Sequence, residues 1–215
     1  MSPVRYLRQH PFSVMALCNI VGDLCYLGFA FAAEGWVSGP KLAGALFTIG
    51  AHIILLAYGD DQARHVATEQ GVMGRVILAL RDFCRRLLRH MPENLLGLIR
   101  AKPVGIGFAM LSLNGVGLLV DALLHSVSWA GLSQILLGGS ALLGCAAFAL
   151  ADYVPCQKRA NLLLKAAPSL FIVATFANVG LAATTHNGFV IVALLVFLTS
   201  NLAGFYAKID KGLAA

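Results

Sequence analysis

The sequence predicts an all-α membrane protein of six transmembrane helices, arranged as three hairpins, with one amphipathic interfacial helix on the cytoplasmic side. Of its 215 residues, 59% are hydrophobic and only 12% are charged, and the mean hydropathy is +0.79. Soluble domains carry roughly a quarter charged residues, so this chain has too little polar surface to cover a water-soluble particle. Six apolar stretches are long enough to cross a bilayer, which takes about 20 residues each.

The first predicted hairpin consists of an apolar run from 13 to 33, a turn at 34–40 and a return from 41 to 58. The segment Ala30-Phe31-Ala32, with a small residue on each side of Phe31, resembles a signal-peptide cleavage site. The run is longer than the typical apolar core of a signal peptide and contains Asp23, so we expect it to remain as a span.

The other two hairpins are predicted at 104–126 with 131–151, and at 168–185 with 188–207. A polar link, 152–167, would join them. The chain then divides into a first hairpin at 1–58, a basic insert at 59–102, a second hairpin at 103–152, and a third hairpin with a short tail at 153–215.

The distribution of basic residues predicts the orientation. With the N-terminus inside, all but one of the 16 Lys and Arg residues fall on the cytoplasmic side, the exception being Lys41. Trp36 and Trp129 would then sit at the outer interface, where indole rings are common. We therefore expect a multi-pass protein of the bacterial plasma (inner) membrane with both termini in the cytoplasm.

The three hairpins show a weak internal similarity. Each opens with a proline, carries an asparagine and a glycine 8–14 residues later, and closes near an aspartate. The prolines are Pro11, Pro103 and Pro168, and the aspartates are Asp60, Asp152 and Asp210. Apolar segments match one another easily, so the pattern is compatible with either a true parallel repeat or chance.

The insert contains a predicted amphipathic helix at 72–91, whose apolar residues follow the 3–4 spacing of a helix. Its arginines exclude it as a span, because each would cost a few kcal/mol at the bilayer centre. We expect these cations to contact anionic lipid headgroups. They are Arg75, Arg81, Arg85, Arg86 and Arg89. Contact with a cytoplasmic partner or with its own bundle is the alternative.

Polar side chains inside the predicted spans are the candidate functional residues. At a rise of about 1.5 Å per residue, several of them share a layer near the bilayer midplane. Asp23 and His52 are expected to face each other as a proton- or cation-handling pair, because the two helices of a short hairpin are neighbours. The remaining members are Asn19, Asn114 and Asn178, with Asp121 nearer the outside. Interhelical hydrogen bonding is the alternative role, above all for the asparagines.

These features predict movement of a small solute or ion across the membrane without nucleotide hydrolysis. The competing prediction is a non-catalytic subunit that assembles with another membrane protein, or with itself, through the small residues at Gly138–Gly144. No metalloprotease, nucleophile-elbow or phosphate-loop motif occurs, so an enzyme is the least expected class. We expect no cofactor, metal or nucleic-acid partner, and no disulfide among the five cysteines.

Overall fold

The computed structural model describes residues 7–34, 39–61, 72–124, 129–185 and 188–209, and these contain helices but no strand. The helices are α2 (Pro11–Glu34), α3 (Gly39–Ile54), the π-helix η1 (Leu55–Gly59), α4 (Val72–Leu88), α5 (Glu93–Ala101), α6 (Pro103–Leu124), α7 (Trp129–Tyr153), α8 (Gln157–Thr185) and α9 (Gly188–Phe205). The prediction of an all-α chain is confirmed. The amphipathic helix expected at 72–91 is present as α4.

Three helical segments in the described part of the chain are long and apolar enough to cross a membrane, judged by length and composition. They are Leu42–Gly59, Pro103–Leu124 and Ile135–Tyr153. Two shorter apolar stretches, Pro11–Cys25 and Ile191–Phe205, lie in α2 and α9. The membrane class predicted from composition therefore holds, whereas three of the six expected spans meet this criterion.

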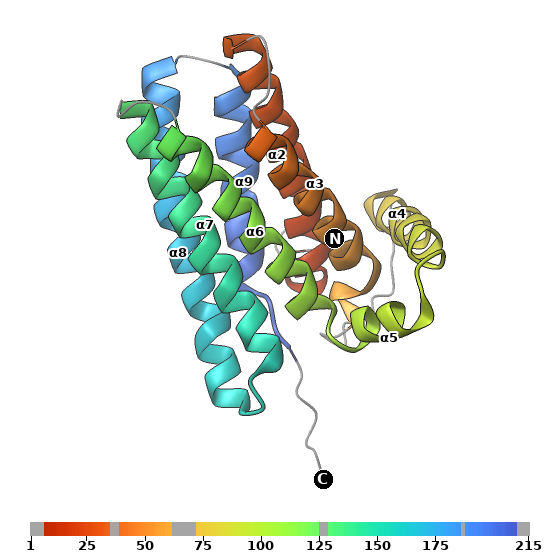
Figure 1. The fold of residues 1–215 in the computed structure, drawn as a ribbon. Coiled ribbons are helices and arrows are strands. Elements are labelled where there is room, and N and C mark those ends of the chain that lie inside the picture. The colour runs from red at the N-terminus through yellow and green to blue at the C-terminus, as the bar shows by residue number, and fades with distance from the viewer. Residues whose placement is uncertain (1–6, 35–38, 62–71, 125–128, 186–187, 210–215) are drawn as a thin grey trace.

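The six long helices pack in sequence order, and α9 packs against α2 to close the ring (Figure 1). α4 and α5 lie beside one end of this bundle. The first hairpin differs from our expectation, because α2 packs mainly on α9 and only lightly on α3, whereas α6 and α7 form an extensive interface. Sequence neighbours joined by a short turn are thus not always the closest partners.

Glycines explain the close contact between α6 and α7. A Cβ atom at Gly115 would lie 2.7 Å from the amide nitrogen of Leu142 and 2.9 Å from the carbonyl oxygen of Gly138. One at Gly138 would lie 3.1 Å from the carbonyl oxygen of Gly115. Only hydrogen fits at these two positions, so the backbones approach directly, as small residues allow in membrane bundles.

One predicted boundary is wrong. We expected a polar link at 152–167 and a span that opens at Pro168, but α8 begins at Gln157 and continues through Pro168. A proline inside a membrane helix is tolerated where neighbouring helices accommodate it. Pro168 is buried, and a Cβ atom at Gly204 of α9 would lie 3.3 Å from its ring.

We call the end of the bundle where α2 and α6 begin, and where η1 and α7 end, the basal end. Its interior is filled by aromatic rings from four helices. Phe108 stacks on Phe148 with centroids 4.4 Å apart, and Phe12 and Phe171 lie 6.3 and 6.1 Å from these two rings, respectively. Three of the four rings are fully buried, so the basal end has a tightly packed apolar core.

Candidate functional site: buried polar residues in the bundle and at its basal end

The carboxylate of Asp60 lies directly at the N-terminus of α2. It accepts hydrogen bonds from the backbone amides of Phe12 at 2.9 Å and Ser13 at 3.2 Å, and from the Ser13 hydroxyl at 2.5 Å. Free amides at a helix start carry a partial positive charge, which a carboxylate complements. Asp60 is only 1% exposed, so it serves as a buried cap that joins the start of α2 to the end of η1.

The π-helix positions this cap. η1 widens the last turns of the second helix just before Asp60. Wider turns and helix ends leave carbonyl groups without their usual partners, and π-turns are frequent at functional sites. Arg85 of α4 supplies a partner, because its Nε donates to the carbonyl oxygen of Ala57 at 2.9 Å.

Two arginines of α4 connect that helix to the bundle. Arg81 lies 3.4 Å from Asp60 and 3.7 Å from Asp61, and Arg85 lies 2.5 Å from Asp61. His10 adds a further basic group, with its Nδ1 3.8 Å from Asp60. These five side chains form what we call the basal network.

The five arginines predicted to contact lipid headgroups are thus divided between two environments. Arg81 and Arg85 are engaged by carboxylates of the bundle, and Arg81 is only 12% exposed. The other three, Arg75, Arg86 and Arg89, are exposed. They border an exposed apolar stripe on α4, formed by Val72, Val76, Phe83 and Leu87, whereas Ile77, Cys84 and Leu88 are buried. Headgroup contact stays a prediction for the three exposed arginines.

A second buried cap has the same form. The Asp152 carboxylate, at the end of α7, accepts a hydrogen bond from the amide of Gly105 in the first turn of α6 at 2.7 Å. Lys102 donates to the Asp152 carbonyl at 2.9 Å and lies 3.6 Å from its carboxylate. Asp152 is 0% exposed, so a carboxylate joins the two ends of the second hairpin as well.

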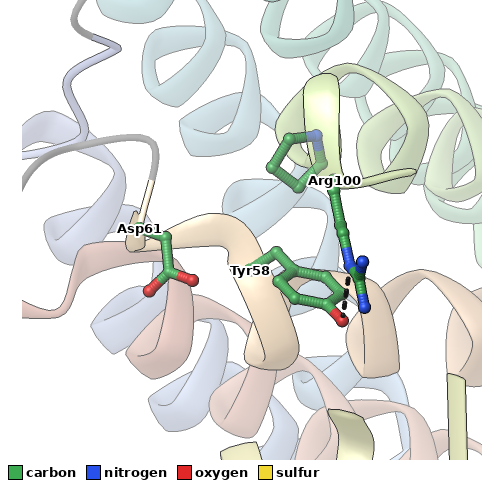
Figure 2. A pocket seen from close by; sticks show the side chains of 4 residues that line it. Tyr58, Asp61 and Arg100 are labelled. Carbon is green, nitrogen blue, oxygen red and sulfur yellow. Dashed lines mark hydrogen bonds between the residues drawn. The ribbon is translucent and has the colours of Figure 1, made fainter. Parts of the chain in front are cut away.

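A pocket of about 350 Å³ opens at the basal end, lined by Tyr58, Asp61, Arg100 and Pro103 (Figure 2). The Nε of Arg100 donates to the hydroxyl of Tyr58 at 3.4 Å, and its guanidinium lies 5.9 Å from the centre of the tyrosine ring. The guanidinium of Arg85 lies 5.3 Å from the same ring. Sequence reasoning missed Tyr58 and Arg100, although a tyrosine before an Asp-Asp pair at the end of a span was a usable signal.

In the last turn of α3, His52 is fully buried. Its Nδ1 lies 2.6 Å from the carbonyl oxygen of Thr48, one turn earlier, and therefore donates to it. Among the described residues, the other ring nitrogen, Nε2, has no hydrogen-bond partner, and neither has the buried hydroxyl of Thr48. Two unsatisfied polar groups thus lie one turn apart inside a membrane-length helix.

Asp23 and His52 make no hydrogen bond or ion pair with each other, contrary to our expectation. The reason is the open first hairpin, in which α2 turns towards α9. The side chain of Asp23 is half-buried in α2. Depth along a helix does not fix the direction in which a side chain points.

The remaining predicted polar residues are scattered. Asn114 of α6 reaches α3, where a Cβ atom at Gly44 would collide with its amide oxygen. Asn19 is half-buried, and Asp121 is buried near the other end of α6. The side chain of Asn178 lies outside the described residues, as do those of Lys41, Trp36, Trp129 and Asp210.

One polar contact between the helices α8 and α9 is fully formed. Asn201 of α9 donates to the Thr175 hydroxyl at 2.7 Å and to the Phe171 carbonyl at 3.3 Å, both on α8. Interhelical hydrogen bonds of this kind hold membrane helices together. This contact therefore has a structural role and contrasts with the unsatisfied pair in α3.

Within the described residues, no group of three His, Cys, Asp or Glu side chains could hold a metal ion. The chain matches no known protein family, no curated protein and no solved structure at a significant level.

Proposed function

We propose that this protein moves a small solute or ion, with a proton or small cation as the first candidate, across the bacterial plasma membrane without nucleotide hydrolysis. The supporting observation is His52, which is completely buried and leaves Nε2 unpartnered. Inside a membrane, polar groups without partners are costly, and ionisable side chains there often mark ion or proton pathways. Thr48 extends this polar surface by one helical turn.

The proposal includes six spans, formed by α2, α3 with η1, α6, α7, α8 and α9. It places the basal end in the cytoplasm, because nearly all Lys and Arg residues of the sequence would then lie on that side. In this arrangement the aromatic core at the basal end blocks the cytoplasmic side of any path along the bundle axis. Passage requires those rings, or the two carboxylate caps around them, to move.

Assembly with another membrane protein is the second candidate. Two glycines of the predicted contact face are used within the chain, since Gly138 packs on α6 and Gly144 packs against Phe171 of α8. A Cβ atom at Gly139 would meet no atom within 4 Å, and Leu136 and Leu143 beside it are exposed. A partner helix could therefore use only the Gly139 side of α7, which favours transport as the first candidate.

Flux measurements test the proposal directly. Purified protein is reconstituted into liposomes that contain a pH-sensitive dye, and a pH step is imposed with potassium and valinomycin present to compensate charge. Wild-type protein should carry protons faster than empty liposomes do. His52→Gln should reduce this flux at least tenfold, whereas His90→Gln, an exposed histidine at the end of α4, should not change it.

Two results would contradict the proton version of the proposal. One is a wild-type rate equal to that of empty liposomes, with sodium and potassium indicators equally silent. The other is an unchanged rate in a folded His52→Gln protein, which would assign the imidazole to packing. Oligomeric state in nanodiscs, compared between wild type and Gly139→Leu, tests the assembly candidate independently.

A further inference from the structure

The pocket at the basal end lies at the level where two membrane-length helices end. Tyr58 is the penultimate residue of the apolar segment Leu42–Gly59, and Pro103 is the first residue of the segment Pro103–Leu124. The helices α3 and α6, which carry these segments, pack against each other. When both cross a bilayer, the pocket between their ends lies at the depth of the lipid phosphates.

Within the part of the chain that the structure describes, Arg100 is the cation of this pocket that lacks an acidic partner. Among the described basic residues around the pocket, Arg81 and Arg85 pair with Asp60 and Asp61, and Lys102 pairs with Asp152. Arg100 has only the Tyr58 hydroxyl, which receives a hydrogen bond from Nε. Its terminal nitrogens are therefore available, and a guanidinium presents them in a fork that matches two oxygens of a phosphate.

Tyr58 is held in a fixed place beside this fork. Its ring contacts the guanidiniums of Arg85 and Arg100, at 5.3 and 5.9 Å, and cations so close to a ring are attracted to its face. Because its hydroxyl oxygen accepts from Arg100, its proton is free to be donated to an anion. Figure 2 shows the ring and the Arg100 guanidinium side by side at the pocket.

Asp61 also lines the pocket and would repel an anion if it were alone. Its carboxylate lies 2.5 Å from Arg85 and 3.7 Å from Arg81, which also pairs with Asp60, so these two guanidiniums balance the two carboxylates and Arg100 remains as the excess positive charge. The local balance around the pocket is therefore positive. Volume is not limiting, since about 350 Å³ falls in the range of sites for small ligands.

We propose that this pocket binds the phosphate of an anionic phospholipid headgroup, with Arg100 as the main ligand and Tyr58 as a second donor. The acyl chains would lie along α3 and α6, which expose Ile49 and Leu113 further along the two helices. This site does not depend on the transport proposal. It assigns the α5–α6 junction to lipid recognition, which differs from the general headgroup attraction expected for α4.

The experiment measures lipid binding to the full-length protein by native mass spectrometry, after release from detergent. The probes are short-chain phosphatidic acid, short-chain phosphatidylcholine and inorganic phosphate. The matched variants are Arg100→Gln and Arg159→Gln, which remove the same charge from two exposed positions on the basal side, only the first of them at the pocket. Tyr58→Phe removes the hydroxyl alone, and thermal unfolding reports whether each variant folds.

We expect one phosphatidic acid molecule to bind more tightly than phosphatidylcholine. Arg100→Gln should weaken it about fivefold, the factor that corresponds to about 1 kcal/mol for one basic residue near an anionic surface. Tyr58→Phe should weaken it less, and Arg159→Gln should have no effect. Equal losses in Arg100→Gln and Arg159→Gln would overturn the site, because attraction would then be diffuse. Displacement of the lipid by millimolar inorganic phosphate would instead identify a site for a soluble anion and overturn the assignment to lipid.

Discussion

Asp60 and Asp152 occupy equivalent positions in two consecutive hairpins. Each carboxylate accepts a hydrogen bond from a backbone amide 47 residues earlier, that of Ser13 in one case and that of Gly105 in the other. In each hairpin the residue three positions before that amide is basic and lies within 4 Å of the carboxylate, at 3.8 Å for His10 and 3.6 Å for Lys102.

This equal spacing supports a relationship between the first two hairpins. A chance similarity of apolar sequences would not be expected to reproduce a capped amide, its carboxylate and a flanking basic side chain at identical separations along the chain. The third hairpin departs from the pattern, since Pro168 lies inside α8, where Pro11 and Pro103 begin their helices. Asp210, its predicted closing residue, lies outside the described residues.

The caps lead to a prediction about stability. Asp152→Ala leaves the first turn of α6 without its acceptor and leaves Lys102 without its acidic partner. We expect a loss of about 1–2 kcal/mol in unfolding free energy, the magnitude of a lost helix cap. A lower thermal unfolding midpoint in detergent would show it. Asp82→Ala, at an exposed position of α4, is the control and should leave the midpoint within a degree or two of wild type.

The attachment of α4 leads to a second prediction. Arg85 contacts the Ala57 carbonyl, Asp61 and the Tyr58 ring, so Arg85→Gln should loosen the whole helix. Amide hydrogen exchange in α4 should become faster by roughly tenfold or more, because local opening becomes easier. Arg89→Gln removes the same charge from an exposed position and should leave exchange unchanged. Equal protection in both variants would mean that the contacts of Arg85 are not needed to hold α4 on the bundle.

A substitution at Asp23 distinguishes a transport role of its carboxylate from a packing role. Asparagine has nearly the same shape but cannot carry a proton or a charge. We expect Asp23→Asn to abolish proton flux in liposomes while expression level and thermal stability stay near those of wild type. Asp82→Asn, which makes the same change on exposed α4, should keep full flux. A fully active Asp23→Asn protein would show that the carboxylate has only a packing role.

The thiols of Cys156 and Cys84 lead to a prediction about how cysteine reactivity depends on pH. Hydrogen bonds from the backbone amides of Arg159 and Lys158, at the start of α8, lower the pKa of the exposed Cys156 thiol. Burial raises the pKa of the Cys84 thiol in α4. Since the thiolate is the reactive form, a lower pKa gives more thiolate at a given pH. Iodoacetamide at pH 7.5 should therefore alkylate Cys156 well before Cys84, and the rate at Cys156 should rise at lower pH than that of a free thiol. Mass spectrometry of peptides measures both rates.

Topology tests the number of spans. Reporter tags at the N-terminus, near residue 70, near residue 160 and at the C-terminus should all report the cytoplasm. Tags near residues 38, 127 and 187 should report the outside. An external signal from residue 160 would remove at least one predicted span, and an external signal from residue 70 would reverse the arrangement of everything that follows it.

Local properties of the sequence determined the membrane class and the elements. Hydropathy over about 20 residues reports whether a segment can lie in lipid, and the 3–4 periodicity of 72–91 reports a helix with one apolar side. Both signals come from residues close together in the chain. For this reason the apolar segments and α4 could be predicted without any knowledge of how the helices pack.

Packing between helices decided which side chains meet and where α8 begins. Whether Arg81 meets a headgroup or a carboxylate depends on which side of α4 faces the bundle, and periodicity alone does not say where the bundle lies. The caps join residues 47 positions apart, and the separation of Asp23 from His52 follows from the preference of α2 for α9. Pro168 could remain inside α8 because it is buried beside Gly204 of α9. Each of these outcomes is set by contacts between distant segments, which form only when the helices come together.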